Sequence, residues 1–359
     1  MNIVFVHSNC ILDQYQVHWR CANIASAIDR TGLNHTVLID IPSFITNDDT
    51  CQRICSEADL IVIHRYNIGP VLQAALYWKA QNKKIVLDID EALTLISEDM
   101  EQYRFWTRGE MLPHLFPDDY PVTRIVPPPV QQITWAMMHI DAITVSSERL
   151  AGDYEEFGRV WVIPDYVDFN QYLVKREDHK NEIWIGFGGG SIPFSTFEKS
   201  GMIYALEEVC HSRQDVRLFL GNMPTEVTQR IDIPNHQKVI CSWFPLEDWA
   251  LYLANIDIGL APVVSEYDLR TSRNRVLEYL ALKIPWIASD HLPYRNLNKY
   301  GLLVENTRED WIQNLMITID SLNYYKKRAE KEPYLYAISQ DINENIGKIL
   351  KVYESILKG

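Results

Sequence analysis

The sequence predicts an α/β protein built from two Rossmann-like domains in tandem. Three observations support this prediction: a length of 359 residues, which suits two cores better than one, a strand–helix alternation in the first half, and its repetition in the second half. Hydrophobic residues make up 47% of the chain, enough to fill both cores. The expected division is an N-terminal domain, 1–168, a C-terminal domain, 169–335, and a final helix, 336–359, that can pack back on the N-terminal domain.

The first half alternates apolar runs with amphipathic segments. Its predicted strands are 2–8, 35–40, 58–65, 83–90, 141–147 and 159–168, and its predicted helices are 15–31 and 70–81. Such alternation is typical of βαβ units with a parallel sheet, so function is expected at the carboxyl ends of the strands. Residues 97–130 contain several prolines and interrupt the alternation of strands and helices, which predicts an excursion or a mobile loop.

The second half repeats the scheme. Its predicted strands are 181–191, 215–222, 237–244, 257–263 and 285–289, and its predicted helices lie near 198–211 and over 246–254. A further helix is expected before Pro285, because Val276, Leu277 and Leu280 recur at helical spacing. Thr271 or Ser272 is expected to be its N-cap. The tail from 311 to 358 is predicted to be helical throughout.

Three arginines, Arg270, Arg273 and Arg275, crowd the start of that helix. A helix N-terminus carries a partial positive charge, so arginine is unfavourable there by a few tenths of a kcal/mol or more. A bound phosphate explains the pattern, because exposed backbone N–H groups and guanidinium groups both bind anions. The alternative is a solvated basic turn or ion pairing with nearby carboxylates.

The bulk composition excludes several classes of partner. A net charge of −14 opposes general affinity for nucleic acid or anionic lipid. Six cysteines without metal-ligand spacing indicate a reducing, cytoplasmic setting. The sequence shows neither a signal peptide nor an apolar run of about 20 residues, so at most peripheral membrane contact is expected.

Several motifs together resemble the GT-B glycosyltransferases, in particular the group 1, GT4-like branch. They are "DIGLAPV" (257–263), "TSRNRVLEYLALKIPWIASDHLPY" (271–294) and "YGLLVENTREDW" (300–311), with "HWRCANIASAI", "VSSERLA" and "VIPDYVD" fitting in the first domain. The resemblance implies two Rossmann-like domains facing a central cleft. It also implies transfer of a hexose from a nucleotide diphosphate sugar to a hydroxyl of a glycan, lipid-linked or protein acceptor, with retention and without a metal or other cofactor.

The resemblance assigns roles to individual residues of the 270–278 segment. Arg275 stands at the family's phosphate-binding position, and Glu278 at the glutamate that holds the donor ribose hydroxyls. Arg270 replaces a glutamate that many relatives carry, and Thr271-Ser272 replaces a Lys-Ser pair. These departures put the identity of the donor sugar in doubt. The expected donor-binding residues here are Arg270, Thr271, Ser272, Arg273, Arg275 and Glu278, and Arg275 is also expected to act in catalysis.

Two further segments are candidates for donor binding. The glycine-rich "GFGGGS" follows a strand, and its backbone can approach a pyrophosphate closely; the alternative is a flexible turn. Trp243 and Phe244 can flank the nucleotide base, although core packing is the alternative for at least one of them. The residues expected to bind the donor are Gly188, Gly189, Gly190, Ser191, Trp243 and Phe244.

The motif "DIDE" (88–91) ends the fourth predicted strand. Paired carboxylates hold Mn²⁺ or Mg²⁺ in GT-A transferases, which is one interpretation. We favour a role for Asp88, Asp90 or Glu91 in orienting the acceptor hydroxyl, with N-capping of the next helix as the alternative. His7 ends the first strand and is the last catalytic candidate, although a lone histidine is more often a structural hydrogen-bonding group.

Two other functions remain open from the sequence. One is a GT-B-type nucleotide-sugar epimerase, which needs no acceptor. The other is a catalytically silent module that binds sugar nucleotides, which the loss of the glutamate at position 270 favours.

Overall fold

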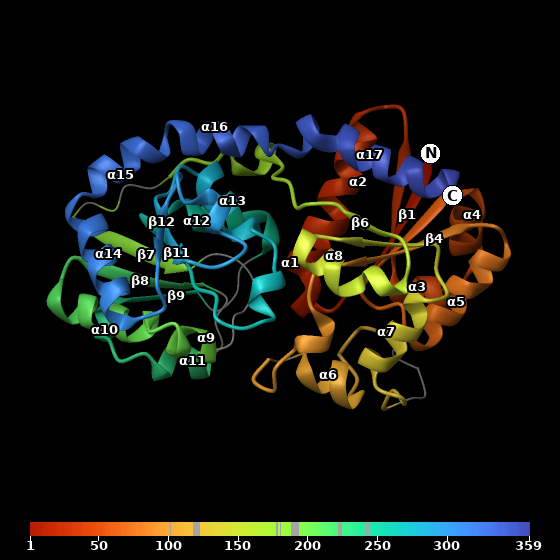
Figure 1. The fold of residues 1–359 in the computed structure, drawn as a ribbon, viewed down its shortest axis with the longest axis horizontal. Coiled ribbons are helices and arrows are strands. Elements are labelled where there is room, and N and C mark those ends of the chain that lie inside the picture. The colour runs from red at the N-terminus through yellow and green to blue at the C-terminus, as the bar shows by residue number, and fades with distance from the viewer. Residues whose placement is uncertain are drawn as a thin grey trace. The chain divides into compact units, whose positions relative to one another are not determined.

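The computed structural model describes residues 1–100, 102–117, 123–176, 179, 181–187, 194–221, 225–241 and 245–359. These residues form two compact units (Figure 1). The first unit comprises Met1–Asp165, Arg270–Ser272 and Ile342–Gly359, and the second comprises Tyr166–Leu269 and Arg273–Asp341. Each unit contains one parallel sheet, and the described residues give each sheet six strands. Six were predicted for the first half, but only five for the second, where the strand Leu302–Val304 was not predicted.

The sheet of the first unit has the order β2-β1-β3-β4-β5-β6. Its strands are β1 (Asn2–His7), β2 (His35–Asp40), β3 (Leu60–His64), β4 (Lys84–Ile89), β5 (Ala142–Val145) and β6 (Val160–Val162). The helices are α1 (Gln14–Val17), α2 (Asn23–Arg30), α3 (Ile41–Thr46), α4 (Asp49–Glu57), α5 (Gly69–Ala80), α6 (Tyr103–Arg108), α7 (Pro129–Met137), α8 (Glu148–Tyr154) and α17 (Ile342–Lys358). A π-helical turn, His18–Ala22, joins α1 to α2, so the single helix predicted over 15–31 has a widened middle turn.

Helix α17 closes the first unit. It packs against α2, and Tyr353 meets Phe5 of β1 edge to face, with ring centroids 6.3 Å apart. Both rings are almost fully buried. The last helix therefore completes the hydrophobic core around the first strand of the chain.

The segment predicted as an excursion or mobile loop is more ordered than its prolines indicate. It contains α6, whose Phe105 and Trp106 are buried, and Tyr66 stacks on Trp106 with ring centroids 5.4 Å apart. Gly109 ends α6 in the left-handed region, with φ of 71°. Aromatic burial therefore holds the described part of this segment against the first unit, which the proline content alone did not indicate.

The sheet of the second unit has the order β12-β11-β10-β7-β8-β9. Its strands are β7 (Ile183–Phe187), β8 (Val216–Gly221), β9 (Lys238–Cys241), β10 (Ile258–Ala261), β11 (Trp286–Ser289) and β12 (Leu302–Val304). The helices are α9 (Phe194–Lys199), α10 (Met202–Ser212), α11 (Thr225–Arg230), α12 (Trp249–Ala254), α13 (Asn274–Ala281), α14 (Arg308–Asp320), α15 (Leu322–Ala329) and α16 (Glu332–Ser339).

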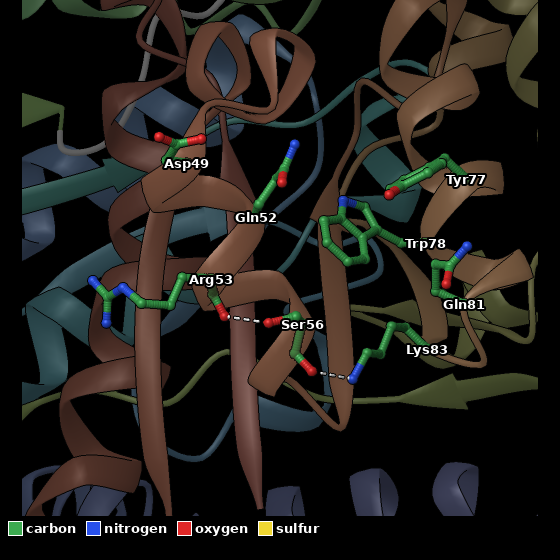
Figure 2. Close-up of a pocket in the computed structure, with 8 residues that line it drawn as sticks. All are labelled: Asp49, Gln52, Arg53, Ser56, Tyr77, Trp78, Gln81 and Lys83. Atoms are coloured by element: carbon green, nitrogen blue, oxygen red, sulfur yellow. Dashed lines mark hydrogen bonds between the residues drawn. The ribbon is translucent and has the colours of Figure 1, made fainter.

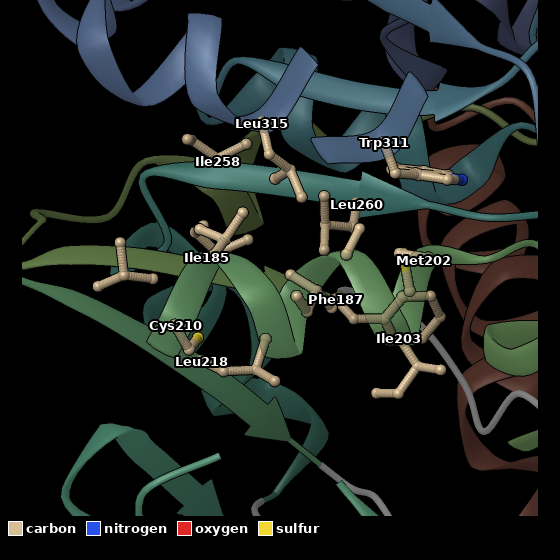
Figure 3. Close-up of a cluster of buried hydrophobic side chains, with 14 of the residues drawn as sticks. Ile185, Phe187, Met202, Ile203, Cys210, Leu218, Ile258, Leu260, Trp311 and Leu315 are labelled. Atoms are coloured by element: carbon tan, nitrogen blue, oxygen red, sulfur yellow. The ribbon is translucent and has the colours of Figure 1, made fainter. Parts of the chain in front are cut away.

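Helices α10 and α14 pack together over one face of this sheet (Figure 3). Ile258 and Leu260 of β10 point into that core, together with Leu315 of α14. Side chains alternate along a strand, so Gly259 faces the other side. A Cβ on Gly259 would lie 2.7 Å from the Tyr279 ring, so its absence allows α13 to pack closely there.

The start of α13 differs from the prediction. The helix begins at Asn274 and its N-cap is Arg273, without a side-chain capping hydrogen bond, so neither Thr271 nor Ser272 is the cap. The Ser272 side chain instead hydrogen-bonds Asp165. The Ser272 hydroxyl, which local sequence predicts to cap the helix, is thus bonded to Asp165, a residue distant in the sequence.

Among the described residues, no helix combines the length and the apolar composition that a membrane crossing requires.

We expect Gly109→Ala to destabilise the protein by about 2 kcal/mol or more, because its φ is positive and a Cβ would lie 2.1 Å from the carbonyl oxygen of Ile125. The control is Gly347→Ala in α17, where nothing lies within 4 Å, and which should stabilise by about 0.5 to 1 kcal/mol. Urea unfolding followed by circular dichroism measures both. Equal effects of the two substitutions would contradict this account of α6.

Candidate functional site

The second sheet has a topological switch point between β7 and β10. The chain leaves β7 toward β8 on one side and leaves β10 toward β11 on the other, which opens a space at the carboxyl ends of these strands. Arg275, in the first turn of α13, reaches this point. Its guanidinium carbon lies 4.2 Å from the centroid of the ring of Phe187, the last residue of β7.

Arg275 is half-buried and is held by aromatic neighbours. Its side chain hydrogen-bonds Tyr294, a phenol whose pKa is raised by burial, while the nearby Arg275 charge opposes that rise. Its backbone N–H donates to Asn274 Oδ1 at 2.8 Å. A phenyl face and a phenol are thus among the groups that orient this guanidinium, and an oriented guanidinium suits the binding of a phosphate.

The other two arginines of the segment have different partners. Arg273 donates from Nη1 to the Tyr336 hydroxyl at 2.6 Å and from Nη2 to Gln340 Oε1 at 2.8 Å, so it ties the start of α13 to α16 and the residue after it. Arg270, at the end of a 3₁₀ turn, is buried in the first unit and forms a bidentate ion pair with Asp153. Arg270 and Arg273 therefore have different partners, and their expected contact with the donor stays a prediction.

Thr271 and Ser272 lie between Arg270 and Arg273 in the sequence, and both are half-buried. They group with the first unit, as Arg270 does. Ser147 of α8 donates to the Arg270 carbonyl oxygen at 3.0 Å, and Asp165 accepts a hydrogen bond from Ser272. These contacts fix the backbone that leads into α13.

Glu278 is completely buried in the second unit. Its Oε1 accepts hydrogen bonds from the Tyr172 hydroxyl at 2.8 Å and from Trp249 Nε1 at 2.7 Å. Tyr172 ends the 3₁₀ turn Phe169–Tyr172, and Trp249 begins α12. The carboxylate therefore joins three elements of the unit, and its expected contact with a ribose stays a prediction.

Six of the expected donor-binding residues lie outside the described residues. They are Gly188, Gly189, Gly190 and Ser191, which directly follow β7, and Trp243 and Phe244, which follow β9.

In the first unit, Arg65 gathers carboxylates at the carboxyl ends of β3 and β4. This arginine is fully buried and has a left-handed backbone, with φ of 59°. Its Nε and Nη2 donate to the two oxygens of Asp90 at 2.6 and 2.8 Å, and Nη2 also lies 2.8 Å from Glu91 Oε1. Nη1 lies 3.3 Å from Asp13, which accepts from the Tyr66 hydroxyl as well.

This arrangement decides the charge state of Asp90. Burial raises the pKa of its carboxyl, but the charge of Arg65 and then the contact with His64, whose Nε2 lies 3.3 Å away, outweigh burial and hold the pKa well below its usual range. Asp90 is therefore ionised near neutral pH. A carboxylate with so low a pKa is a poor general base, but it can accept a hydrogen bond and orient a hydroxyl.

Asp88 belongs to a separate buried network. Arg20 donates to its two oxygens at 2.9 and 2.7 Å and also pairs with Asp165 at 2.8 Å, while Thr144 donates to Asp88 at 2.6 Å. Asp88 thus pairs with Arg20, whereas Asp90 pairs with Arg65. The described residues contain no group of three or more His, Cys, Asp or Glu side chains placed to hold a metal ion.

His7, the last residue of β1, is half-buried, and its Nδ1 lies 3.1 Å from the carbonyl oxygen of Ser8. His7 therefore lies at the carboxyl edge of the first sheet, the same edge as Asp90 and Glu91. Its strand, β1, neighbours β3.

Two buried arginines, Arg20 and Arg65, were not among the site residues expected from the sequence. Arg65 directly follows the strand "LIVIH", and a charged residue immediately after a buried parallel strand is a usable signal for the carboxyl edge. Arg20 sits in the amphipathic segment 15–31, where an arginine is normally expected on the exposed face.

Neither a protein-family model nor a curated protein sequence matches the chain. Solved structures do match. The N-terminal domain of trehalose-6-phosphate phosphatase from Candida albicans gives a TM-score of 0.61 at 11% identity and covers 99% of each chain. The UDP-GlcNAc 2-epimerase from Neisseria meningitidis bound to UDP-GlcNAc gives 0.54 at 11% identity and covers 100% of both chains. TarM gives 0.58 at 12% identity, covering 85% of this chain and 58% of its own.

Identities this low establish the fold alone. The two parallel sheets with flanking helices match the two Rossmann-like domains of GT-B proteins, so the fold class expected from the sequence is confirmed. Membership in the group 1 branch stays a prediction.

We expect Arg65→Met to destabilise the protein by about 3 to 5 kcal/mol, because it leaves Asp13, Asp90 and Glu91 without their shared cation. The control is Arg104→Met in the same unit, whose guanidinium is 73% exposed and 3.9 Å from Glu110. That change should cost less than about 1 kcal/mol. Urea unfolding measures both, and a cost below 1 kcal/mol for Arg65→Met would show that the cluster does not need its cation.

Proposed function

We propose that this protein is an enzyme acting on a nucleotide diphosphate sugar, and that it transfers a hexose from that donor to a hydroxyl acceptor. The observation that carries the proposal is the position of Arg275, half-exposed at the switch point of the second sheet and at the first turn of a helix. Phosphates bind at such helix ends in α/β proteins because backbone N–H groups and the helix dipole favour an anion.

The chemistry proposed for Arg275 is electrostatic. As the bond from the sugar to the diphosphate breaks, negative charge develops on the departing phosphate oxygens, and a fixed guanidinium stabilises it. The aromatic contacts with Phe187 and Tyr294 would keep the guanidinium in place before the charge develops. No step of this proposal needs a metal ion.

On the acceptor side, Asp90 and Glu91 are the proposed partners of the acceptor hydroxyl. The low pKa of Asp90 favours a reaction in which the hydroxyl is oriented by a carboxylate rather than deprotonated in advance. In the proposed step the acceptor oxygen bonds the anomeric carbon as the sugar–phosphate bond breaks, and the hydroxyl proton passes to the departing phosphate oxygen. The proposal includes retention of configuration and no covalent intermediate on a protein side chain. The acceptor would be a glycan, a lipid-linked sugar or a protein.

A second candidate function is epimerisation of a nucleotide sugar. It is favoured by the similarity to the Neisseria meningitidis UDP-GlcNAc 2-epimerase, which extends over the whole of both chains. Epimerisation at a carbon next to the anomeric centre requires a group that removes and returns a proton. The ionised, arginine-bound Asp90 is poorly suited to that task, which is why we favour transfer.

Incubation with nucleotide sugars in the absence of acceptor tests the choice between the two functions. An epimerase converts UDP-GlcNAc alone to its epimer, whereas a transferase gives at most slow hydrolysis and needs an acceptor for rapid turnover. We expect acceptor-dependent turnover that persists in EDTA. Epimer formation from UDP-GlcNAc alone would establish the second function, and a complete loss of turnover in EDTA restored by Mn²⁺ would overturn the metal-independent mechanism.

Arg275→Ala should weaken binding of UDP, GDP or ADP by about 2 kcal/mol, roughly 30-fold, because it removes a charge-assisted contact to phosphate. The control is Arg213→Ala, which removes a guanidinium that precedes β8 and pairs with Asp215 and Asp320. Calorimetric titration measures both affinities. If the preferred nucleotide binds Arg275→Ala as it binds the unchanged protein, the anion site is misplaced.

Glu278→Gln separates a ribose contact from a purely structural role. A glutamine oxygen can still accept from Tyr172 and Trp249, so a structural role predicts nearly unchanged nucleotide affinity. If the carboxylate also accepts from the ribose hydroxyls, affinity should fall by about 1.5 to 3 kcal/mol. A dideoxyribose analogue checks the assignment: the unchanged protein should bind it much more weakly than the parent nucleotide, and the Gln variant should bind the two almost equally. Equal discrimination by both proteins would mean that Glu278 does not contact the ribose.

A further inference from the structure

A hollow of about 560 Å³ lies between α4 and α5 of the first unit (Figure 2). Its volume is in the range of small-molecule sites. The lining residues come from one side of α4, from the last turn of α5 and from the connection to β4; they are Asp49, Gln52, Arg53, Ser56, Tyr77, Trp78, Gln81 and Lys83.

The hollow is separate from the residues proposed for catalysis. Ser56 and Lys83 come shortly before β3 and β4 begin, so this end of the hollow lies at the amino edge of the first sheet. Asp90 and Glu91 follow the end of β4 and therefore lie at the opposite, carboxyl edge. A ligand in the hollow would not contact them.

The spacing of polar residues on α4 explains why the hollow exists. Asp49, Gln52, Arg53 and Ser56 are three or four positions apart, so they share one side of the helix. The buried Cys51 and Cys55 form the side that packs on the core. Neighbouring helices on a sheet normally close together with apolar side chains, whereas α4 turns a polar side toward α5 and leaves a gap.

The charges around the hollow are largely engaged or directed elsewhere. Lys83 donates through Nζ to the carbonyl oxygens of Ser56 and Ala58. Figure 2 shows the guanidinium of Arg53 extending away from α5. Asp49 remains on the wall with the carboxamides of Gln52 and Gln81. Besides these two cations, the walls therefore offer one carboxylate and neutral groups that both donate and accept hydrogen bonds.

Two aromatic side chains form the α5 side of the hollow. Tyr77 is 48% exposed, and its ring meets that of Trp78 edge to face at 5.1 Å. Trp78 is 4% exposed, and its Nε1 atom is itself buried, with no acceptor within the described part of the chain. Figure 2 shows the indole nitrogen on the side of the ring that faces Gln52.

We propose that this hollow is a saccharide-binding site separate from the nucleotide-sugar site, and that its ligand is a neutral sugar of an oligosaccharide chain. Aromatic rings accept the apolar C–H face of a sugar ring, and carboxamides with a single carboxylate match its hydroxyls, each of which can donate and accept. A phosphate or an acidic peptide is less favoured, because Asp49 repels an anion and Figure 2 shows the guanidinium of Arg53 pointing away from the aromatic side of the hollow. The inference goes beyond the proposed function and does not depend on it.

The test uses the full chain, fluorescently labelled, on a printed panel of neutral and anionic oligosaccharides, followed by titration with the best neutral one. We expect a neutral oligosaccharide to be retained and Tyr77→Ala to weaken it at least about tenfold, because the exposed ring is lost. Trp78→Phe keeps a ring but removes the N–H donor and should weaken binding about threefold or more. Tyr204→Ala, which removes a tyrosine that is 47% exposed on α10, is the matched control and should leave binding unchanged.

Arg275→Ala distinguishes this site from the proposed nucleotide-sugar site, because it should lose nucleotide and keep the oligosaccharide. The proposal is overturned if the panel retains no neutral oligosaccharide, if retention is confined to anionic ones, or if Tyr77→Ala binds as Tyr204→Ala does. It is also overturned if Arg275→Ala abolishes oligosaccharide binding. Should Trp78→Phe fail to fold, Tyr77→Ala still decides the question, since its side chain is half-exposed.

Discussion

Two buried arginines hold the carboxyl edge of the first sheet together. Arg20 joins Asp88 to Asp165, and Arg65 joins Asp90 to Asp13. Removing such charges from water costs several kcal/mol per ion, so they are tolerated only where each is closely paired and hydrogen-bonded. The consequence is a rigid edge: Asp90 is ionised and fixed to the end of β3, and the backbone after β4 cannot move without breaking a bidentate pair.

The elements that depend on local sequence could be predicted well. The strand over 35–40 matches β2 residue for residue, and the helix predicted over 70–81 is α5, Gly69–Ala80. Apolar periodicity determines both, because each buries one face or a continuous run against the same core. The start of α13 could not be predicted in this way. The hydroxyl of Ser272 hydrogen-bonds Asp165, more than a hundred residues away, so the cap position shifted to Arg273.

The candidate site could be predicted only in part, for the same physical reason. Local sequence places Arg270, Arg273 and Arg275 at one helix start, but their partners come from distant segments: Asp153 for Arg270 and Tyr336 for Arg273. Which side chain reaches the switch point depends on the tertiary packing of α13 against β10 and on the side chains already engaged. Arg275 was assigned by resemblance, and the structure shows its guanidinium over the Phe187 ring; its role in donor binding stays a prediction.

The same residue type therefore serves two different physical roles in this protein. Arg20 and Arg65 are fully buried and are neutralised by carboxylates. Their ion pairs join neighbouring backbone segments of the first unit. Arg275 is half-exposed, and a phenyl face and a phenol orient it. Partner type and exposure, rather than the number of arginines in a segment, thus distinguish the two buried arginines from Arg275, whose proposed role is to meet an anion.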